Sequence, residues 1–325
     1  MKNSCPNESF DSDPNAPDLL KCIQGGEMIA FIGSGLSCVV GYPAWHILVE
    51  DMRIKCGVQH PHALNEDTGA DLLQKIAQLA KESDRDAYVD VLENAFAQTV
   101  KSIPGVYHAL LNTEFAAYCT TNYDPLLAKA IAGWPGSNRR VYAYPEFHVR
   151  GLSGGNVVYL HGYIEEHGKP DPERLVLCLD DFDKAYNPEP QRRLIDMWSN
   201  IWNDFDILFI GCKLREPQMA AMLGQLCKLE QAQTRDCNIP PHRRFIMLPQ
   251  EETETARELG ISSKEANTYK RQAANAEYAK YGISVVRYDA KDKDHIGLTE
   301  VMSKWPSAPK PVVFSRTSEG VSYDR

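Results

Sequence analysis

The chain has 325 residues, 43% of them hydrophobic and 24% charged, which suits a globular protein of one large domain with an insertion, or of two domains. Its formal net charge of −9 at pH 7 gives no support to direct nucleic-acid binding, which usually goes with a basic surface. No apolar run approaches the length of a membrane span and no signal-peptide core is present, so we expect a cytoplasmic protein without a membrane partner.

The first predicted strand, Met28–Ile32, runs directly into the sequence Gly-Ser-Gly-Leu-Ser at 33–37. Gly33 and Gly35 allow a tight turn and a close approach of the backbone to a ligand. A helix beginning after such a turn would offer its free N–H groups to a phosphate. Taken alone, the turn fits a nucleotide site and a plain strand-to-helix connection about equally well.

A helical stretch follows this turn. Residues 44–56 have apolar side chains at helical spacing, and residues 68–112 continue that pattern without a strand-like run. We therefore interpret 58–112 as a helical insertion or cap that separates the first strand from the remaining strands.

From residue 113 onward, predicted strands and helices alternate. Strands are expected at Phe115–Thr120, Val157–Leu160, Leu175–Leu179, Asp206–Ile210, Phe245–Leu248 and Ile283–Tyr288, with helical segments between them and a last helix at Leu298–Trp305. This alternation predicts an α/β fold with a doubly wound parallel sheet of the Rossmann-like kind. The expected organisation is a flexible arm over 1–17, a nucleotide-binding domain over 18–57 and 113–305, the insertion over 58–112 and a tail over 306–325.

Polar and small residues gather at the predicted carboxyl ends of these strands, where doubly wound sheets bind their ligands. They are Gly33 to Ser37 after the first strand, then Thr121, Asn122 and Asp124, then His161, and then Gly211. Each also has a plain structural interpretation, such as a turn or helix cap for Asn122 and Asp124. Their convergence on one edge of the sheet favours a binding site.

Two common nucleotide motifs are excluded. The dinucleotide fingerprint requires a third glycine where this chain has Cys38, and an acidic residue ending a second strand about twenty residues further on. The corresponding stretch, HILVEDMRIK, has a helical pattern. A P-loop is excluded because no Lys-Ser/Thr pair follows the glycines. A hydride-transferring dehydrogenase is therefore a poor fit.

The motifs GSGLS, TTNYD, LHG and IGCKL resemble, in this order, the motifs of the sirtuins. With GYPAW after the first loop, they are more closely similar to the SIR2-like domain of bacterial anti-phage defence proteins. The resemblance spans about residues 18–290 and implies a sirtuin-type fold that binds NAD in an extended cleft. In that cleft, the resemblance places ten residues: Gly33, Ser34, Gly35 and Ser37 at the pyrophosphate, Thr121, Asn122 and Asp124 at the nicotinamide and its ribose, His161 at the ribose hydroxyls or a water, Gly211 near the adenosine half, and Trp45 shielding the nicotinamide.

The chain departs from the deacetylase sirtuins in three ways. Its nine cysteines form no Cys-x-x-Cys pair or zinc-spaced cluster, so the family's zinc module is missing and we predict no zinc. The Asp, Phe and Arg of the family's Gly-Ile-Pro-Asp-Phe-Arg segment are replaced within 41–46, and Cys212 stands where a hydroxyl residue is usual. These departures fit the defence proteins, which the resemblance implies to hydrolyse NAD rather than to use it for deacylation.

The chemistry of hydrolysis agrees with the candidate residues. Nicotinamide is a good leaving group, and the protein mainly has to position the ribose and admit one water. We expect Asn122 and His161 to be catalytic: Asn122 would hold the ribose or the water, and an imidazole of ordinary pKa could orient or deprotonate that water. The expected activity is an NAD+ glycohydrolase that releases nicotinamide and ADP-ribose. The alternatives are an NAD or ADP-ribose sensor that gates a partner, and a deacylase or ADP-ribosyltransferase.

The expected partners follow from the same resemblance. It implies an NAD-depleting effector of anti-phage defence that forms a homo-oligomer and is activated by a partner such as a HerA-like ATPase, an Argonaute module or a phage protein. An unregulated NAD hydrolase would poison its own cell, so we expect the site to be gated. The insertion at 58–112 and the N-terminal arm are the candidates for that contact.

Overall fold

The computed structural model describes residues 8–99, 102–134, 138–187, 193–214, 216–238, 240–250, 263–291 and 296–306. Its centre is a seven-stranded sheet in the order β3-β4-β2-β1-β5-β6-β7, in which each pair of neighbouring strands is parallel. The strands are β1 (Met28–Ile32), β2 (Ala117–Thr120), β3 (Val141–Ala143), β4 (Asn156–Tyr159), β5 (Asp206–Ile210), β6 (Arg244–Pro249) and β7 (Ile283–Tyr288). The doubly wound α/β fold predicted from the sequence is confirmed.

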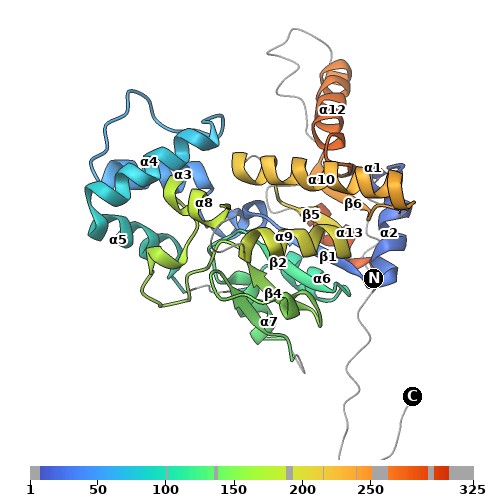
Figure 1. Cartoon of the computed structure of the whole chain (residues 1–325), viewed down its shortest axis with the longest axis horizontal. Helices are drawn as coiled ribbons and strands as arrows, with labels where there is room; N and C mark the ends of the chain where they lie inside the picture. Colours follow the sequence, from blue (N-terminus) through green and yellow to red (C-terminus); the bar gives the residue numbers. More distant parts are fainter. Residues whose placement is uncertain are drawn as a thin grey trace, which may run out of the picture.

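Helices cover both faces of this sheet (Figure 1). One hydrophobic cluster joins Met28, Ala30 and Ile32 of β1 to α2 (Ala16–Gly25), α6 (Gly105–Leu111), α7 (Leu126–Ala132) and α13 (Ile296–Ser303). A second cluster joins Ile29 and Phe31 to α9 (Arg193–Asp204) and α10 (Pro217–Cys237), and includes Tyr278 near the end of α12 (Ser263–Ala279). Alternate residues of β1 therefore enter opposite cores, which explains why the strand is one continuous apolar run.

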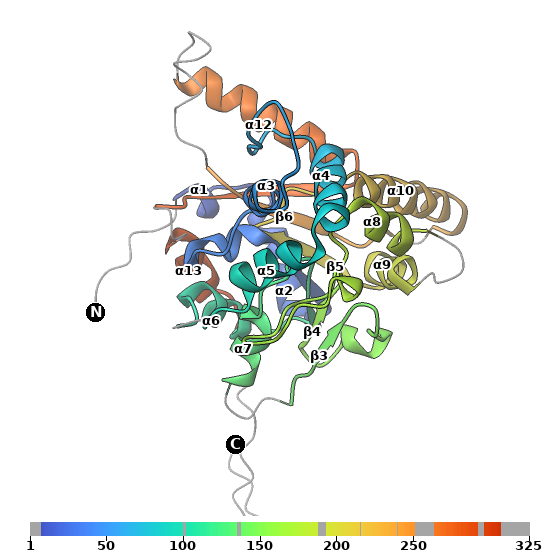
Figure 2. The same cartoon turned by 90° about the vertical axis from the view of Figure 1, so that its left-hand side faces the viewer.

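Four helices form a cap at one side of the sheet: α3 (Trp45–Lys55), α4 (Ala70–Ser83), α5 (Arg85–Phe96) and α8 (Leu179–Ala185). Figure 2 looks onto this cap and shows α3, α4 and α5 in front of the strands. Between β1 and β2 the described residues contain helices and turns but no strand of the sheet. The predicted insertion over 58–112 does not belong to the cap as a whole. Its last helix, α6, packs against α7 and α13 in the layer that covers the sheet.

The prediction of a flexible arm over 1–17 is wrong for residues 8–17. This segment forms α1 (Glu8–Asp11) and the start of α2, and Phe10 is buried. Its polar side chains bind β7 at the edge of the sheet: Asn15 Nδ2 donates to the Val285 carbonyl at 2.9 Å, and Asp13 Oδ2 accepts from the Arg287 N–H at 2.9 Å. The polar side chains that made this segment resemble a disordered one therefore form hydrogen bonds with the backbone of an edge strand. Residues 1–7, and the expected tail beyond 306, lie outside the described residues.

Two further local predictions are wrong. Residues 175–178 are buried but belong to no strand: they follow a 3-10 turn at Pro172–Arg174 and lead into α8. The edge position beside β4 is taken by β3, a partly exposed strand of three residues that is too short to give a strand pattern in the sequence. No α-helix begins directly after the glycine turn either, because Ser34–Leu36 and Cys38–Val40 form 3-10 turns and α3 begins only at Trp45. Backbone turns, not a helix N-terminus, therefore adjoin Gly33. A further 3-10 turn, at Val149–Leu152, lies between β3 and β4.

None of the helices in the described ranges is both long enough and apolar enough to cross a membrane.

Candidate active site

The site lies where the winding of the sheet reverses. Strand β1 pairs with β2 on one side and with β5 on the other, so the loops after β1 and β5 leave the same edge in different directions. Such a switch point is where doubly wound sheets open a ligand crevice. Here the two loops interlock: the Gly33 N–H donates to the Ile210 carbonyl at 2.8 Å, and the Gly35 N–H donates to the Gly211 carbonyl at 3.1 Å.

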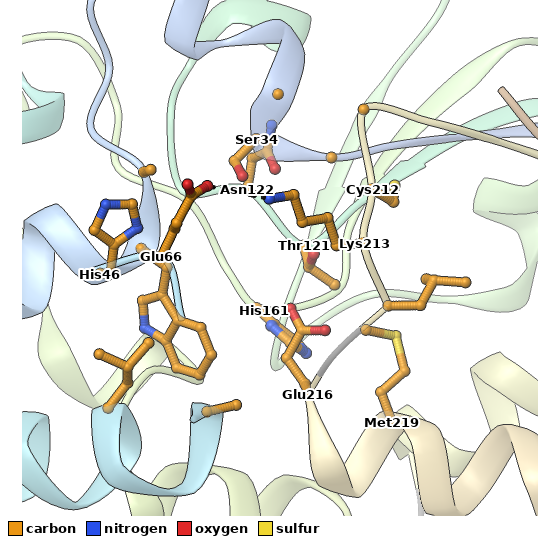
Figure 3. A pocket seen from close by; sticks show the side chains of 18 of the residues that line it. Ser34, His46, Glu66, Thr121, Asn122, His161, Cys212, Lys213, Glu216 and Met219 are labelled. Carbon is orange, nitrogen blue, oxygen red and sulfur yellow. Dashed lines mark ion pairs between the residues drawn. The ribbon is translucent and has the colours of Figure 1, made fainter. Parts of the chain in front are cut away.

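A pocket of about 720 Å³ opens at this point, a volume typical of cofactor sites, which range over roughly 300–1,000 Å³. The structure brings all ten predicted site residues to its wall: Gly33, Ser34, Gly35, Ser37, Trp45, Thr121, Asn122, Asp124, His161 and Gly211. Figure 3 shows Thr121, Asn122 and His161 entering the pocket from the sheet side. The pocket wall therefore agrees with the rule that ligands bind at strand ends, while the role of each residue is a separate question.

Hydrogen bonds to Thr120 and Ser37 hold Asn122 in place. Thr120 Oγ1 donates to the Ile32 carbonyl at 2.7 Å and accepts from the Asn122 N–H at 3.0 Å. Asn122 Nδ2 donates to Ser37 Oγ at 3.1 Å, and Ser37 Oγ lies 3.0 Å from the buried Tyr107 hydroxyl. No group in the described part of the chain donates to Asn122 Oδ1. That oxygen is therefore the acceptor available to a ligand.

Asp124 lies in the same network and is 4% exposed. Its Oδ1 accepts from the Leu126 N–H at 3.1 Å, in the first turn of α7. Burial raises the pKa of Asp124 above its ordinary value, although hydrogen bonds from Ser37, Leu126 and Asn122 favour the charged form. Asp124 thus anchors the loop as well as facing the pocket.

This pKa shift predicts a pH-dependent effect of Asp124→Asn. The folded protein holds the Asp124 proton more tightly than the unfolded chain does, so the contribution of this group to stability falls as pH rises from the unfolded pKa to the folded one. The variant lacks that titration. We expect it to melt above the wild type at neutral pH, and the difference to shrink as the pH falls toward 4. Thermal melts between pH 4 and 8 measure this, with the exposed Asp51→Asn as control; a difference independent of pH would contradict it.

The imidazole of His161 is more buried than its sequence context suggested. It is 2% exposed, its Nε2 lies 2.9 Å from the Tyr186 hydroxyl, and its ring meets Phe182 edge to face at 5.2 Å. Desolvation lowers the pKa of His161 to about 3. The ordinary, near-neutral pKa assumed from the sequence is therefore wrong, and the ring is neutral at physiological pH. A neutral ring does not repel a cationic ligand, but it is a weak base.

Trp45 begins α3 and lines the pocket beside Phe182, with ring centroids 6.1 Å apart. Its indole Nε1 is buried, as is the Tyr42 hydroxyl, and neither atom has a hydrogen-bond partner within the ranges that the structure describes. Both residues come from the segment that replaces the sirtuin Gly-Ile-Pro-Asp-Phe-Arg sequence. The pocket wall thus carries two donors without an acceptor.

Charged residues that the sequence motifs do not identify also line the pocket, among them Glu66, Lys213 and Glu216. Glu216 comes just before Pro217, the first residue of α10, and Lys213 lies in the loop after β5. Lys213 Nζ lies 3.6 Å from Glu66 Oε2, across the pocket (Figure 3). A carboxylate six residues beyond a strand end was the available signal for Glu216, but only the contacts of α10 show where it points.

The cap is joined to α10 beside the pocket. Gln74 of α4 and Gln218 of α10 exchange hydrogen bonds of 2.8 and 3.0 Å between their amide groups, and Gln74 is fully buried. The exposed Lys213–Glu66 ion pair adds a second link of modest strength. The cap thereby forms one wall of the pocket. In the described ranges, no three His, Cys, Asp or Glu side chains gather as metal ligands.

Comparisons with known proteins identify the family of this chain. Residues 116–285, more than half of the chain, match the model of the SIR2-like domain. The NAD(+) hydrolase ThsA of Bacillus cereus (strain MSX-D12) is 23% identical over 239 residues, which are 72% of this chain and 46% of that protein. The NAD(+) hydrolase ThsA of Enterococcus faecium is 22% identical over 207 residues, or 63% and 41% of the two chains. The chain thus spans less than half the length of these relatives.

Among solved structures, a chain described under "Structural Basis for the Mechanism and Regulation of Sir2 Enzymes" is 13% identical, with a TM-score of 0.40, and the match covers 78% of this chain and 97% of that one. The family assignment rests on the SIR2-like domain match, which includes the strand ends that carry Thr121, Asn122, Asp124, His161 and Gly211. The chain belongs to the SIR2-like domain family.

Proposed function

We propose that this protein hydrolyses NAD+ at the bond between nicotinamide and ribose, releasing nicotinamide and ADP-ribose. The observation that carries the proposal is the meeting of Asn122, His161 and the interlocked Gly33 and Gly211 loops in one pocket of about 720 Å³. The SIR2-like domain and the two relatives named NAD(+) hydrolase support the same substrate.

The arrangement suits a reaction that needs positioning more than covalent chemistry. Cleavage leaves positive charge on the ribose, so the protein gains most by fixing that ring and excluding bulk water. In the proposal, Asn122 Oδ1 accepts a hydrogen bond from a ribose hydroxyl or the attacking water. The neutral His161, whose Nε2 interacts with Tyr186, supplies a polar contact to the ribose without adding a cation.

The remaining residues fit the other parts of NAD+. Gly33, Ser34 and Gly35 present a backbone without bulky side chains to the pyrophosphate, with Ser37 behind them. Thr121 and Asp124 adjoin the nicotinamide riboside, the Trp45 ring covers it, and Gly211 adjoins the adenosine half. These positions are part of the proposal.

Turnover of NAD+ by the purified chain tests the proposal directly. We expect nicotinamide and ADP-ribose to appear in equal amounts as NAD+ is lost, measured by chromatography over a range of protein concentrations. Loss of NAD+ without free ADP-ribose would instead indicate cyclisation or transfer. Tight NAD+ binding without turnover, at each protein concentration and with the candidate activators, would favour the sensor and overturn the proposal.

The cellular role is a further part of the proposal. We infer a cytoplasmic, homo-oligomeric effector that depletes NAD+ in abortive anti-phage defence and is held inactive until a HerA-like ATPase, an Argonaute module or a phage protein engages it. The motif resemblance to defence proteins supports this role. The cap wall, joined to α10 through Gln74 and Gln218, is a place where such a partner would act on the pocket.

A further inference from the structure

We propose that Glu216 is the catalytic base of this site and takes the proton of the attacking water. This inference rests on the proposed NAD+ hydrolysis and adds to it a residue that the motifs do not identify. Glu216 lines the same pocket as Asn122 and His161. In Figure 3 its side chain reaches from the start of α10 into the pocket, toward His161 and away from Met219.

The carboxylate of Glu216 differs from those of Asp124 and Glu66, which line the same pocket, in having no side-chain partner. Asp67 and Glu277 also line the pocket, but both are exposed to solvent. Asp124 accepts from the Leu126 N–H and interacts with Ser37 and Asn122. Glu66 pairs with Lys213. For Glu216, no side chain in the described part of the chain donates a hydrogen bond or forms an ion pair. The Glu216 carboxylate is partly buried and interacts with its own backbone N–H, so a bound ligand would supply the missing side-chain partner.

The groups that face Glu216 leave its charge uncompensated. They are the hydroxyls of Tyr123 and Tyr186 and the thiol of Cys212, and the Glu216 charge contributes to the raised pKa of each. The nearby His161 ring is neutral. Burial accordingly raises the pKa of Glu216. The positive charge of NAD+, and later of the ribose, would provide the missing counter-charge.

Glu216 is also a better base than His161. The His161 Nε2 already interacts with the Tyr186 hydroxyl, and its pKa of about 3 leaves little affinity for a proton. A carboxylate whose pKa is raised toward the working pH is the stronger acceptor. We therefore assign positioning of the ribose to His161 and proton transfer to Glu216.

The step balances without any other reactant. The water oxygen forms a bond to C1′ of the ribose while the C1′–N bond breaks. The bonding electron pair leaves with the nicotinamide ring, which becomes neutral. The proton of the water passes to the Glu216 carboxylate and then to solvent, leaving ADP-ribose.

Glu216→Gln tests the assignment because it keeps the shape and removes the base. We expect kcat for nicotinamide release to fall at least 100-fold, with the Kd for NAD+ changed less than fivefold. In the wild type, kcat/KM should rise with pH as the base loses its proton, and this rise should vanish in the variant. Glu216→Asp should keep the rise at reduced kcat, and formate should partly restore Glu216→Gln. The exposed Glu93→Gln on α5 is the matched control and should behave as wild type.

The outcomes separate the two proposals. Nicotinamide release by Glu216→Gln within fivefold of wild type, with the same pH profile, would overturn the role of Glu216 and leave NAD+ hydrolysis standing. A fall in activity that follows only weaker NAD+ binding would overturn it as well. Absence of nicotinamide release from the wild type would overturn the proposed function, and this inference with it.

Discussion

Replacing Asn122 with alanine should lower kcat for NAD+ cleavage by about 10²–10³-fold, the usual loss when one preorganised polar contact to a transition state is removed. That loss corresponds to about 3–4 kcal/mol of barrier. The effect should be large because Asn122 Nδ2 is fixed on Ser37 Oγ at 3.1 Å and the Asn122 N–H on Thr120 Oγ1, so Oδ1 needs no reorientation to bind. Steady-state nicotinamide release together with calorimetric binding of ADP-ribose would separate kcat from affinity.

His161→Ala should give a loss of at least tenfold for a related reason, since it removes the ring that positions the ribose and opens space beside Phe182 and Tyr186. Asn94→Ala is a suitable control because Asn94 is exposed on α5 and its side-chain amide donates to the Asp90 carbonyl of the same helix, away from the pocket. Full activity in both Asn122→Ala and His161→Ala would show that the site has been assigned to the wrong residues.

Much of this site followed from the sequence because it is built on strand ends. Met28–Ile32, Asp206–Ile210 and Ile283–Tyr288 are strands with the predicted limits, since each is a mostly apolar run bounded by turns. Once the sheet is parallel and doubly wound, the residues after such strands must share an edge. Asn122 and His161 could therefore be brought together without any knowledge of side-chain contacts.

The parts that failed depend on packing between distant segments. Residues 175–178 are as apolar as a strand, but the Val176 N–H donates to the His161 carbonyl outside the sheet, and no local pattern distinguishes the two cases. The low pKa of His161 comes from its burial, and that burial is produced by α8 and by Tyr186. The position of Glu216 in the pocket depends on the direction of α10, which the sequence pattern does not specify. Sequence patterns thus located the strand ends, whereas the electrostatics of the pocket needed the packed structure.

Gly33→Ala should unfold the protein at lower denaturant, with a fall of about 3 kcal/mol in the free energy of unfolding, the upper end of the usual cost of overpacking. Gly33 has an ordinary extended backbone, with φ of −104°, so the cost comes from space and not from conformation. A Cβ at Gly33 would lie 2.3 Å from the Gly211 carbonyl oxygen and 2.8 Å from Cys212 Cα. These are backbone atoms and have no rotamer with which to move away.

Relief therefore requires the ends of β1 and β5 to separate, which would break the 2.8 Å bond from the Gly33 N–H to Ile210 and the 3.1 Å bond from Gly35 to Gly211. NAD+ affinity should fall together with stability, because the same two loops form the pocket. Gly25→Ala is the matched control: nothing lies within 4 Å of a Cβ there, and the residue ends α2, so the change should stabilise by a few tenths of a kcal/mol. Equal unfolding midpoints for the two variants would mean that close contact between the Gly33 and Gly211 loops does not hold the pocket together.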